Sequence, residues 1–190
     1  MDPRAARTRA SLQDALLALA RERSLDELTV GDIVQRAGVN RSSFYQHYGD
    51  KETLLADALE EALGEVAAPL RAAPRASAPP AMPPELMVYL EHVAQNATLY
   101  RRVLGDHGSA VVAGRLRARI ESIVSDTVGL ADPDVFADMP LDVVGAGIAG
   151  TALGVIGAWV ARDPLPPVEV AAQWLWQILV APGLSWPAAR

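Results

Sequence analysis

The spacing of apolar residues is the feature of this 190-residue sequence that most restricts its fold. Apolar side chains recur three and four residues apart through most of the chain, and no stretch alternates cleanly between apolar and polar residues. Leu12, Ala15, Leu16 and Leu19 are the first such set and predict a helix over residues 4–23. Because a strand would instead show a repeat of about two residues, we expect an all-α fold.

Two short helices joined by a tight turn are predicted next. Thr29 and Asp32 have the Thr-x-x-Asp spacing of a capping box, so a second helix should begin directly after Thr29. Gly38 should end it, because glycine adopts the left-handed conformation of a helix stop at low cost. Asn40 is suited to cap a third helix, which we expect to extend to about Tyr48.

The remainder of the chain is predicted to be helical as well. Asp50 should cap a fourth helix, whereas residues 68–84 hold six prolines, which cannot continue a helix and predict a connector. Further helices are expected over residues 85–95, 97–104, 109–128, the glycine-rich stretch after residue 142 and residues 168–181, with a loop over residues 129–140. The prediction is about nine helices, divided into a three-helix domain of residues 1–50 and a larger helical domain of residues 51–190.

Positive charge is concentrated early in the chain. The net charge is −6, yet residues 1–51 carry eight Lys and Arg against seven Asp and Glu, so the acidity lies in the later part. Arg36, Arg41 and Lys51 surround the predicted third helix, which favours a nucleic-acid partner for the first domain. The expected basic arm before them is formed by Arg4, Arg7 and Arg9.

Several classes of chemistry are excluded by residue usage. The sequence holds no cysteine, so disulfides, thiolate nucleophiles and cysteine-ligated metals are ruled out. His47, His92 and His107 lack metal-ligand spacing, and no G-x-S-x-G or H-E-x-x-H motif is present. The first ten residues have no apolar core of a secretory signal. We therefore expect a cytoplasmic protein that is not an enzyme and carries neither metal nor cofactor.

The predicted third helix has two different faces. At about 100° per residue, Phe44 and Tyr48 lie on one side and should face the core. The opposite side presents Arg41, Tyr45 and Gln46 together with serine hydroxyls, groups that can bond to base edges or phosphates. A capped helix, a glycine turn and a protruding second helix of this kind are typical of a helix-turn-helix.

This segment resembles the TetR family of transcriptional regulators, whose amino-terminal pattern is close to T-V-x-D-I-A-x-x-A-G-V-S-x-x-T-F-Y-x-H-F-x-x-K-E-x-L. The resemblance covers about residues 4–63, and Asn40, Ser43 and Tyr48 depart from the pattern only conservatively. The matching residues are Thr29, Val30, Asp32, Ile33, Ala37, Gly38, Val39, Phe44, Tyr45, His47, Lys51, Glu52 and Leu54. The resemblance implies an all-α protein with a DNA-binding domain followed by a variable ligand-binding and dimerisation domain.

The resemblance also implies roles for individual residues. His47 and Lys51 are expected to contact the DNA backbone, and Gly31 can offer only its own backbone. The predicted DNA-binding residues are Gly31, Arg41, Ser42, Ser43, Tyr45, Gln46, His47 and Lys51.

The glycine-rich stretch leaves three hypotheses open. Gly145, Gly147 and Gly150 match G-x-G-x-x-G, the phosphate loop of nucleotide-dependent oxidoreductases, but only forty residues follow in which to build the required sheet. Residues 143–161 carry no charge and could form a membrane anchor. The third hypothesis comes from the family, whose last two long helices pair with a second subunit as a four-helix bundle. It predicts a dimer interface that includes Gly147, Gly150, Gly154, Gly157, Trp174 and Trp176.

The hypothesis that these observations favour is a homodimeric, ligand-responsive regulator, more a repressor than an activator by what the family implies. It should bind a palindromic operator in double-stranded DNA and be released by a small-molecule effector, without a membrane partner. An apolar set with a few polar groups is typical of ligand sites. The candidates for this set are Met87, Tyr89, His92, Asn96, Tyr100 and Trp159.

Overall fold

The computed structural model describes residues 3–72, 82–105, 108–128 and 139–180. The described part of the chain forms nine α-helices and a single turn of 3-10 helix, with no strand, which confirms the all-α prediction. In chain order, these elements are α1 (Pro3–Glu22), η1 (Leu25–Glu27), α2 (Val30–Ala37), α3 (Arg41–His47), α4 (Lys51–Ala72), α5 (Pro84–Gln95), α6 (Ala97–Leu104), α7 (Ala110–Val128), α8 (Leu141–Val160) and α9 (Val168–Val180).

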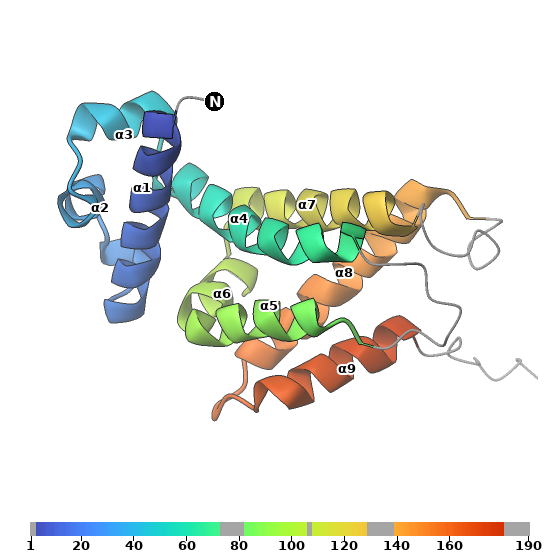
Figure 1. The fold of residues 1–190 in the computed structure, drawn as a ribbon. Coiled ribbons are helices and arrows are strands. Elements are labelled where there is room, and N and C mark those ends of the chain that lie inside the picture. Colours follow the sequence, from blue (N-terminus) through green and yellow to red (C-terminus); the bar gives the residue numbers. More distant parts are fainter. Residues whose placement is uncertain (1–2, 73–81, 106–107, 129–138, 181–190) are drawn as a thin grey trace, which may run out of the picture.

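The predicted caps of the amino-terminal helices are confirmed. The Thr29 hydroxyl accepts from the Asp32 amide at 3.2 Å, and the Asp32 carboxylate accepts from the Thr29 amide at 2.9 Å. Gly38 ends α2 with φ of 66°, in the left-handed region. The Asn40 side chain then accepts from the Ser43 amide at 2.7 Å and starts α3. Local hydrogen bonds therefore set the sharp turn between α2 and α3 (Figure 1).

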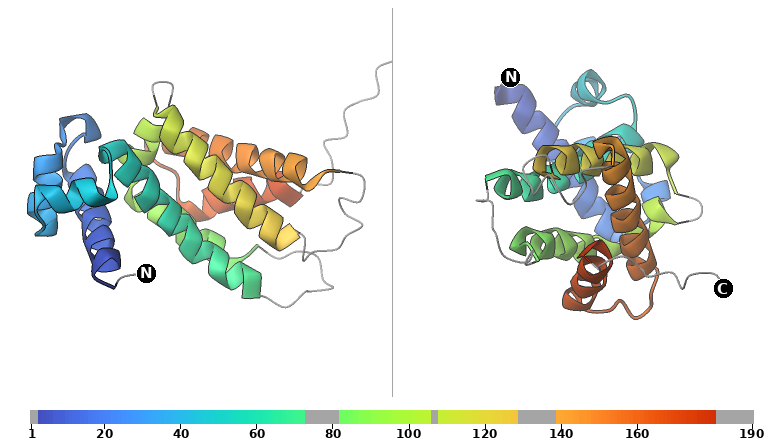
Figure 2. Two further views of the ribbon diagram at one scale, coloured as in Figure 1. Left: turned by 90° about the horizontal axis from the view of Figure 1, so that it is seen from above. Right: turned by 90° about the vertical axis from the view of Figure 1, so that its right-hand side faces the viewer.

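The remaining helices form a separate bundle that packs on the first domain through α4. Helices α4 and α7 lie side by side, and α8 packs against the other side of α7 and against α9 (Figure 2). Helix α5 lies between α4 and α9, and α6 packs on α8. Trp159 and Tyr100 are the largest fully buried side chains at the centre of this bundle. Because α4 and α6 also pack against α1, both helices connect the two parts.

One predicted boundary is wrong. The prolines of residues 68–84 were expected to end the fourth helix before Ala68, yet α4 continues through Pro69 to Ala72. A proline inside a helix removes one hydrogen bond and crowds the preceding turn, at a cost of about 3 kcal/mol. Packing of α4 against α1, α5 and α7 offsets this cost. Helix α5 starts at Pro84, a position where a missing amide costs nothing. The rest of the predicted connector and most of the predicted loop over residues 129–140 lie outside the described residues.

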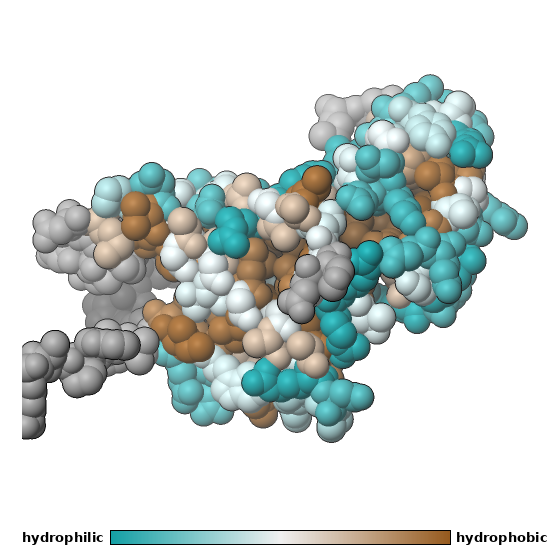
Figure 3. Space-filling view, turned by 180° about the vertical axis from the view of Figure 1, so that it is seen from behind, coloured by the Kyte–Doolittle hydropathy of each residue, from teal (hydrophilic) through white to brown (hydrophobic). Residues whose placement is uncertain are grey.

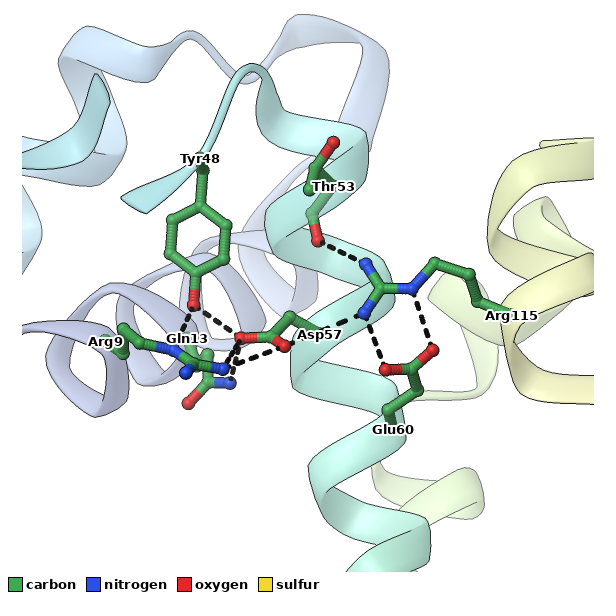
Figure 4. Close-up of polar contacts among 7 residues, drawn as sticks. All are labelled: Arg9, Gln13, Tyr48, Thr53, Asp57, Glu60 and Arg115. Atoms are coloured by element: carbon green, nitrogen blue, oxygen red, sulfur yellow. Dashed lines mark hydrogen bonds and ion pairs between the residues drawn. The ribbon is translucent and has the colours of Figure 1, made fainter. Parts of the chain in front are cut away.

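A polar cluster at one carboxylate joins the two parts of the molecule (Figure 4). Asp57 of α4 accepts from the Arg9 guanidinium at 2.7 and 3.0 Å, from the Gln13 amide at 3.1 Å and from the Tyr48 hydroxyl at 2.6 Å. Arg115 of α7 approaches the same carboxylate at 3.7 Å. We call these five residues the Asp57 cluster; it joins α1, the end of α3, α4 and α7.

The charges in the Asp57 cluster stabilise one another. Burial would raise the pKa of Asp57, but hydrogen bonds from Tyr48 and Arg9 hold this pKa below the ordinary value of 3.8. Burial and the hydrogen bond to Asp57 raise the pKa of Tyr48 to about 12. The carboxylate is therefore ionised and the phenol protonated at neutral pH.

The Asp57 cluster predicts a specific acid sensitivity. A carboxyl group with a lowered folded-state pKa contributes stability above its unfolded-state pKa, and this contribution is lost as the pH falls through the folded-state pKa. We expect the free energy of unfolding to fall below about pH 4. Asp57→Asn should cost about 2 kcal/mol at pH 7 and flatten this acid dependence. Urea unfolding between pH 7 and pH 3 measures both effects. Glu61→Gln, at an exposed position of the same helix, is the control; an equal flattening in the control would contradict the prediction.

Gly38 gives a second stability prediction. Nothing lies within 4 Å of the position of a Cβ atom there, so Gly38→Ala tests backbone strain alone. The left-handed conformation should cost the alanine variant about 1–2 kcal/mol of unfolding free energy. Gly114→Ala, in α7 with equally open surroundings, should instead stabilise the protein by up to about 1 kcal/mol. Chemical denaturation of the two variants should give shifts of opposite sign, and shifts of equal sign would contradict the strain argument.

Candidate nucleic-acid interface

Helix α3 presents the predicted polar face to solvent. Phe44 is fully buried and Tyr48 is 4% exposed, as expected for the core side, whereas Tyr45 is 51% exposed. Arg41, Ser42 and Gln46 are also exposed. Helices α2 and α3 lie at the end of the molecule away from α9 (Figure 1), where a DNA duplex can approach.

The outward side chains of α3 support one another. The Arg41 guanidinium donates to the Tyr45 hydroxyl at 3.4 Å and lies 5.8 Å from the centre of the Tyr45 ring. The Tyr45 ring meets Phe44 edge-on at 5.3 Å, so the core fixes its position. Ser42 donates to the Asn40 side chain at 2.7 Å and keeps its acceptor lone pairs. This surface offers a cation, an aromatic hydroxyl and the Gln46 amide, the groups that read bases and phosphates.

The remaining predicted contacts flank this surface. Ser43 and His47 are half-buried at the edges of α3, and the His47 ring lies 6.4 Å from that of Tyr48. Gly31 is exposed in the first turn of α2, where a backbone amide has no partner inside the helix and suits a phosphate. Hydrogen bonds from the Thr29 side chain and backbone, with Arg23, lower the pKa of Asp32 in the same turn to about 2.

Lys51 has a structural role that the sequence did not indicate. Its ammonium donates to the backbone carbonyls of Leu25 at 2.8 Å, Leu28 at 3.0 Å and Asp26 at 3.4 Å. Leu25 and Asp26 belong to the short helix η1 and Leu28 directly follows it, so Lys51 ties η1 to the start of α4. Its predicted phosphate contact would have to compete with these bonds, and it stays a prediction.

Two arginines of the expected basic arm have partners within the chain. Arg9 turns inward to Asp57, and Arg7 donates to the carbonyl of Pro3 at 3.3 Å. Arg36 pairs with Glu22 at 3.1 Å. Sequence reasoning missed the partner of Arg9 because Asp57 lies 48 residues away, and no local pattern links the two.

Three of the six predicted ligand-site residues come together in the second domain. The rings of Tyr89, His92 and Tyr100 lie 6.0–6.5 Å apart, and the two tyrosine hydroxyls are 3.3 Å from each other. Asn96 lies beside this group and accepts from the Arg21 guanidinium of α1 at 2.9 Å. Trp159 instead donates to the carbonyl of Pro166 at 2.9 Å, a bond that satisfies its indole nitrogen.

The aromatic group is polar but uncharged. Burial raises the pKa of Tyr89 to about 12 and also raises that of Tyr100, while burial and the nearby charge of Arg21 lower the pKa of His92. The Nε2 atom of His92 is buried without a hydrogen-bond partner. Such an atom carries a desolvation cost and can bond to a neutral group placed against it.

A separate surface pocket of about 320 Å³ lies between α6, α7 and α8. It includes none of the six predicted ligand residues, but it does include Gly150 and Gly154. Its lining is formed by Val103, Leu104, Gly105, Gly108, Ser109, Ala110, Ala113, Arg117, Gly150, Leu153 and Gly154.

The four glycines of the predicted dimer interface do not share one environment. Gly147 and Gly154 are exposed with open space around them. A Cβ atom on Gly150 would lie 3.5 Å from Arg117, and one on Gly157 would lie 3.6 Å from Leu104, so these two face neighbours within the chain.

Apolar side chains are exposed on both helices of the predicted interface. Leu141 and Val143 are 47% and 53% exposed at the start of α8, and Ile178 is 57% exposed near the end of α9. Trp174 is half-buried beneath Arg162, with the guanidinium 4.9 Å from its ring, and Trp176 is half-buried as well. Figure 3 shows one face of the second domain on which apolar residues reach the surface between polar ones.

The oxidoreductase hypothesis is wrong, because the phosphate loop that it requires is not formed by these glycines. Gly145, Gly147 and Gly150 all lie inside α8, whereas a phosphate loop joins a strand to a helix. A Cβ atom on Gly145 would lie 3.6 Å from the backbone of Glu121, so this glycine lets α8 approach α7 closely. Within the described residues, α8 is also the one helix long and apolar enough to cross a membrane, and 44% of its apolar window is buried inside the chain.

Comparisons with known proteins agree with this geometry. Residues 12–58 match the model of the bacterial regulatory proteins of the tetR family. Over 67 residues the chain is 36% identical to the uncharacterized HTH-type transcriptional regulator YxbF of Bacillus subtilis (strain 168). That match covers 35% of this chain and only 18% of YxbF, so the chain spans a small part of this relative's length.

Solved structures match over nearly the whole chain. Thermus thermophilus FadR, a TetR family transcriptional repressor in complex with lauroyl-CoA, aligns with a TM-score of 0.62 and 21% identity, covering 96% of this chain and 99% of its own. The dihydroxyacetone kinase operon activator DhaS aligns with a TM-score of 0.64 and 16% identity, covering 92% and 94%. At these identities the likeness establishes the fold. Residues 12–58 therefore carry a domain of the tetR family of bacterial regulatory proteins, and the chain as a whole shares the fold of these structures.

Proposed function

We propose that this protein is a homodimeric transcriptional regulator that binds a palindromic operator through α3 and is released by a small-molecule effector. The exposed side of α3 is the observation that carries the proposal. Arg41 and Tyr45 contact each other there, and the Tyr45 ring packs edge-on against Phe44. Both residues lie in the segment that matches the tetR family. A preorganised cation and aromatic hydroxyl on a protruding helix suit a major groove.

Dimerisation is supported by the exposed faces of α8 and α9. Leu141, Val143 and Ile178 are about half exposed, and the open Gly147 and Gly154 lie seven residues apart on α8. Apolar side chains beside glycines allow a second pair of helices to pack closely. Two copies would place two α3 helices against successive major grooves, which explains why a palindrome is expected.

The second domain supports an apolar effector with a neutral polar group. Tyr89 and Tyr100 are buried and His92 is half-buried beside them. The group is uncharged near neutral pH, so burying a charged ligand group against it would be costly. The lauroyl-CoA bound to Thermus thermophilus FadR has a long apolar chain and a thioester carbonyl, and by analogy supports this ligand class. We assign the protein to the cytoplasm, with repression as its mode of action, since that relative is a repressor.

Release from DNA requires the effector to prefer the non-binding conformation. To change the population from mostly bound to mostly free, this preference must reach roughly 5.5 kcal/mol. In a dimer it can be divided between two effector molecules.

The primary test is selection of bound sequences from random duplex DNA by the purified protein. A palindrome with two half-sites about one helical turn apart is the expected result. Enrichment of a single half-site would contradict the dimer. If no sequence is enriched even at low salt, after the protein has been unfolded and refolded to remove any bound ligand, operator binding itself is refuted.

Tyr45 provides the sharpest test of the reading face. Its side chain is half exposed and contacts the core only at the ring edge, so Tyr45→Ala should leave the free energy of unfolding nearly unchanged. Loss of its base or phosphate contact should weaken binding to the selected duplex by about 10- to 100-fold. Val88→Ala, at a 61% exposed position of α5, is the control. Similar affinities for the two variants in a fluorescence titration would exclude Tyr45 from the interface.

Arg41 and Lys51 should differ in their dependence on salt. Each cation that neutralises a phosphate contributes about one unit to the slope of log affinity against log salt. Arg41→Ala should therefore reduce this slope, whereas Lys51→Met should chiefly lower stability, because its ammonium is already bonded to the Leu25 and Leu28 carbonyls. Titrations at three salt concentrations measure the slopes, and a reduced slope for Lys51→Met would show that Lys51 contacts a phosphate as well.

A further inference from the structure

The end of the reading helix is tied to the carboxylate at the centre of the Asp57 cluster. Tyr48 follows α3 directly, and its amide donates to the carbonyl of Phe44 at 2.9 Å, which closes the last turn of the helix. Its hydroxyl donates to Asp57 of α4 at 2.6 Å. Because α3 has only seven residues, it depends on such contacts for its orientation.

The same carboxylate is reached from the second domain by Arg115 of α7. This guanidinium bonds both oxygens of Glu60 at 2.8 and 2.6 Å and the carbonyl of Thr53 at 3.3 Å, and it lies 3.7 Å from Asp57. Figure 4 shows Arg115 between the two carboxylates of α4. Its hold on Asp57 is the longest of these contacts and the most sensitive to a shift of α7 along α4.

Other contacts between the two parts reach different elements. Arg21 of α1 bonds to Asn96, and Arg102 of α6 forms an ion pair with Asp26 of η1 at 3.1 Å. The Asp57 cluster differs from both because it includes the residue that closes the reading helix. Together with Glu60 the cluster has no net charge, because two arginine guanidiniums face two carboxylates. Any change in their pairing would leave one charge without a partner.

We propose that Arg115 is a positioning residue for DNA reading: through Asp57 it sets the orientation of α3, and a displacement of α7 reaches the DNA by changing the pairing of Arg115. This inference rests on the proposed function for its consequence on DNA, but the link between α7 and α3 is a property of the free protein. Helix α7 packs against α8 as well as α4, so events in the second domain reach Arg115 directly.

The test compares two arginines of the same helix. Arg115→Met removes the link, whereas Arg117→Met removes an equal charge from an exposed position that faces α8. Amide hydrogen exchange on the full chain should show residues 41–48 exchanging roughly three- to tenfold faster in Arg115→Met than in Arg117→Met, with α8 unchanged. The proposal would be overturned if residues 41–48 exchanged equally fast in the two variants. It would also be overturned if Arg115→Met lost as much protection in α8 as in residues 41–48.

A double variant tests the route through the carboxylate. If Arg115 acts through Asp57, then Arg115→Met should add no further exchange in residues 41–48 to that of Asp57→Asn. Additive effects would show that Arg115 acts by another path and would overturn the proposal. These measurements need no DNA and no effector, so they stand whether or not an operator is found.

Binding to the selected duplex then tests the consequence for reading. The affinity for the selected duplex is compared with that for duplexes in which the half-sites are one or two base pairs farther apart. The wild type and Arg117→Met should prefer the selected spacing, and this preference should be about fivefold or more smaller in Arg115→Met. Unchanged discrimination would overturn the proposal even if exchange is altered. Failure of the wild-type protein to select any sequence would instead refute the proposed function, and it would leave the exchange result to decide the link between α7 and α3.

Discussion

The arrangement of the two parts of this molecule depends on one carboxylate. Asp57 accepts four hydrogen bonds from Arg9, Gln13 and Tyr48, and its side chain is only 17% exposed. A partly buried charge of this kind is stable only when its partners are fixed around it, which makes the geometry of α1, α3 and α4 mutually dependent. Acid sensitivity, the placement of the reading helix and the influence of α7 on it all follow from this single requirement.

What the sequence predicted well is what is encoded locally. The capping box at Thr29, the stop at Gly38 and the cap at Asn40 are each confirmed, because local geometry decides them. Hydrogen bonds between residues three positions apart form the two caps, and the left-handed conformation of Gly38 forms the stop. The two faces of α3 were likewise predicted from periodicity alone. Helix continuation through Pro69 was missed because packing along α4, which involves distant helices, outweighs the local preference.

Side-chain partners distant in sequence could not be predicted. Arg9 and Lys51 looked like free cations in a basic segment, but Arg9 pairs with Asp57, and Lys51 donates to the carbonyls of Leu25 in η1 and of Leu28 directly after it. Both have a charge that is consistent with DNA binding, so composition gave no reason to separate them from Arg41. In the second domain, Tyr89, His92 and Tyr100 lie together, but their role as ligand residues stays a prediction. The pocket between α6, α7 and α8 depends on a crossing of helices that no local pattern specifies.

The glycines of α8 lie on two different sides of the helix, one packed within the chain and one open. Gly145 and Gly157 pack against Glu121 and Leu104 within the chain, while Gly147 and Gly154 face open space. A helix with small residues on two sides can approach its own neighbours on one and, in the proposed dimer, a second subunit on the other. Because α8 also packs against α7, the dimer contact and the Asp57 cluster would be separated by a single layer of helix. A change in the way two subunits pack would then reach Arg115 by the same route as an effector, which gives subunit pairing and DNA reading a common structural path.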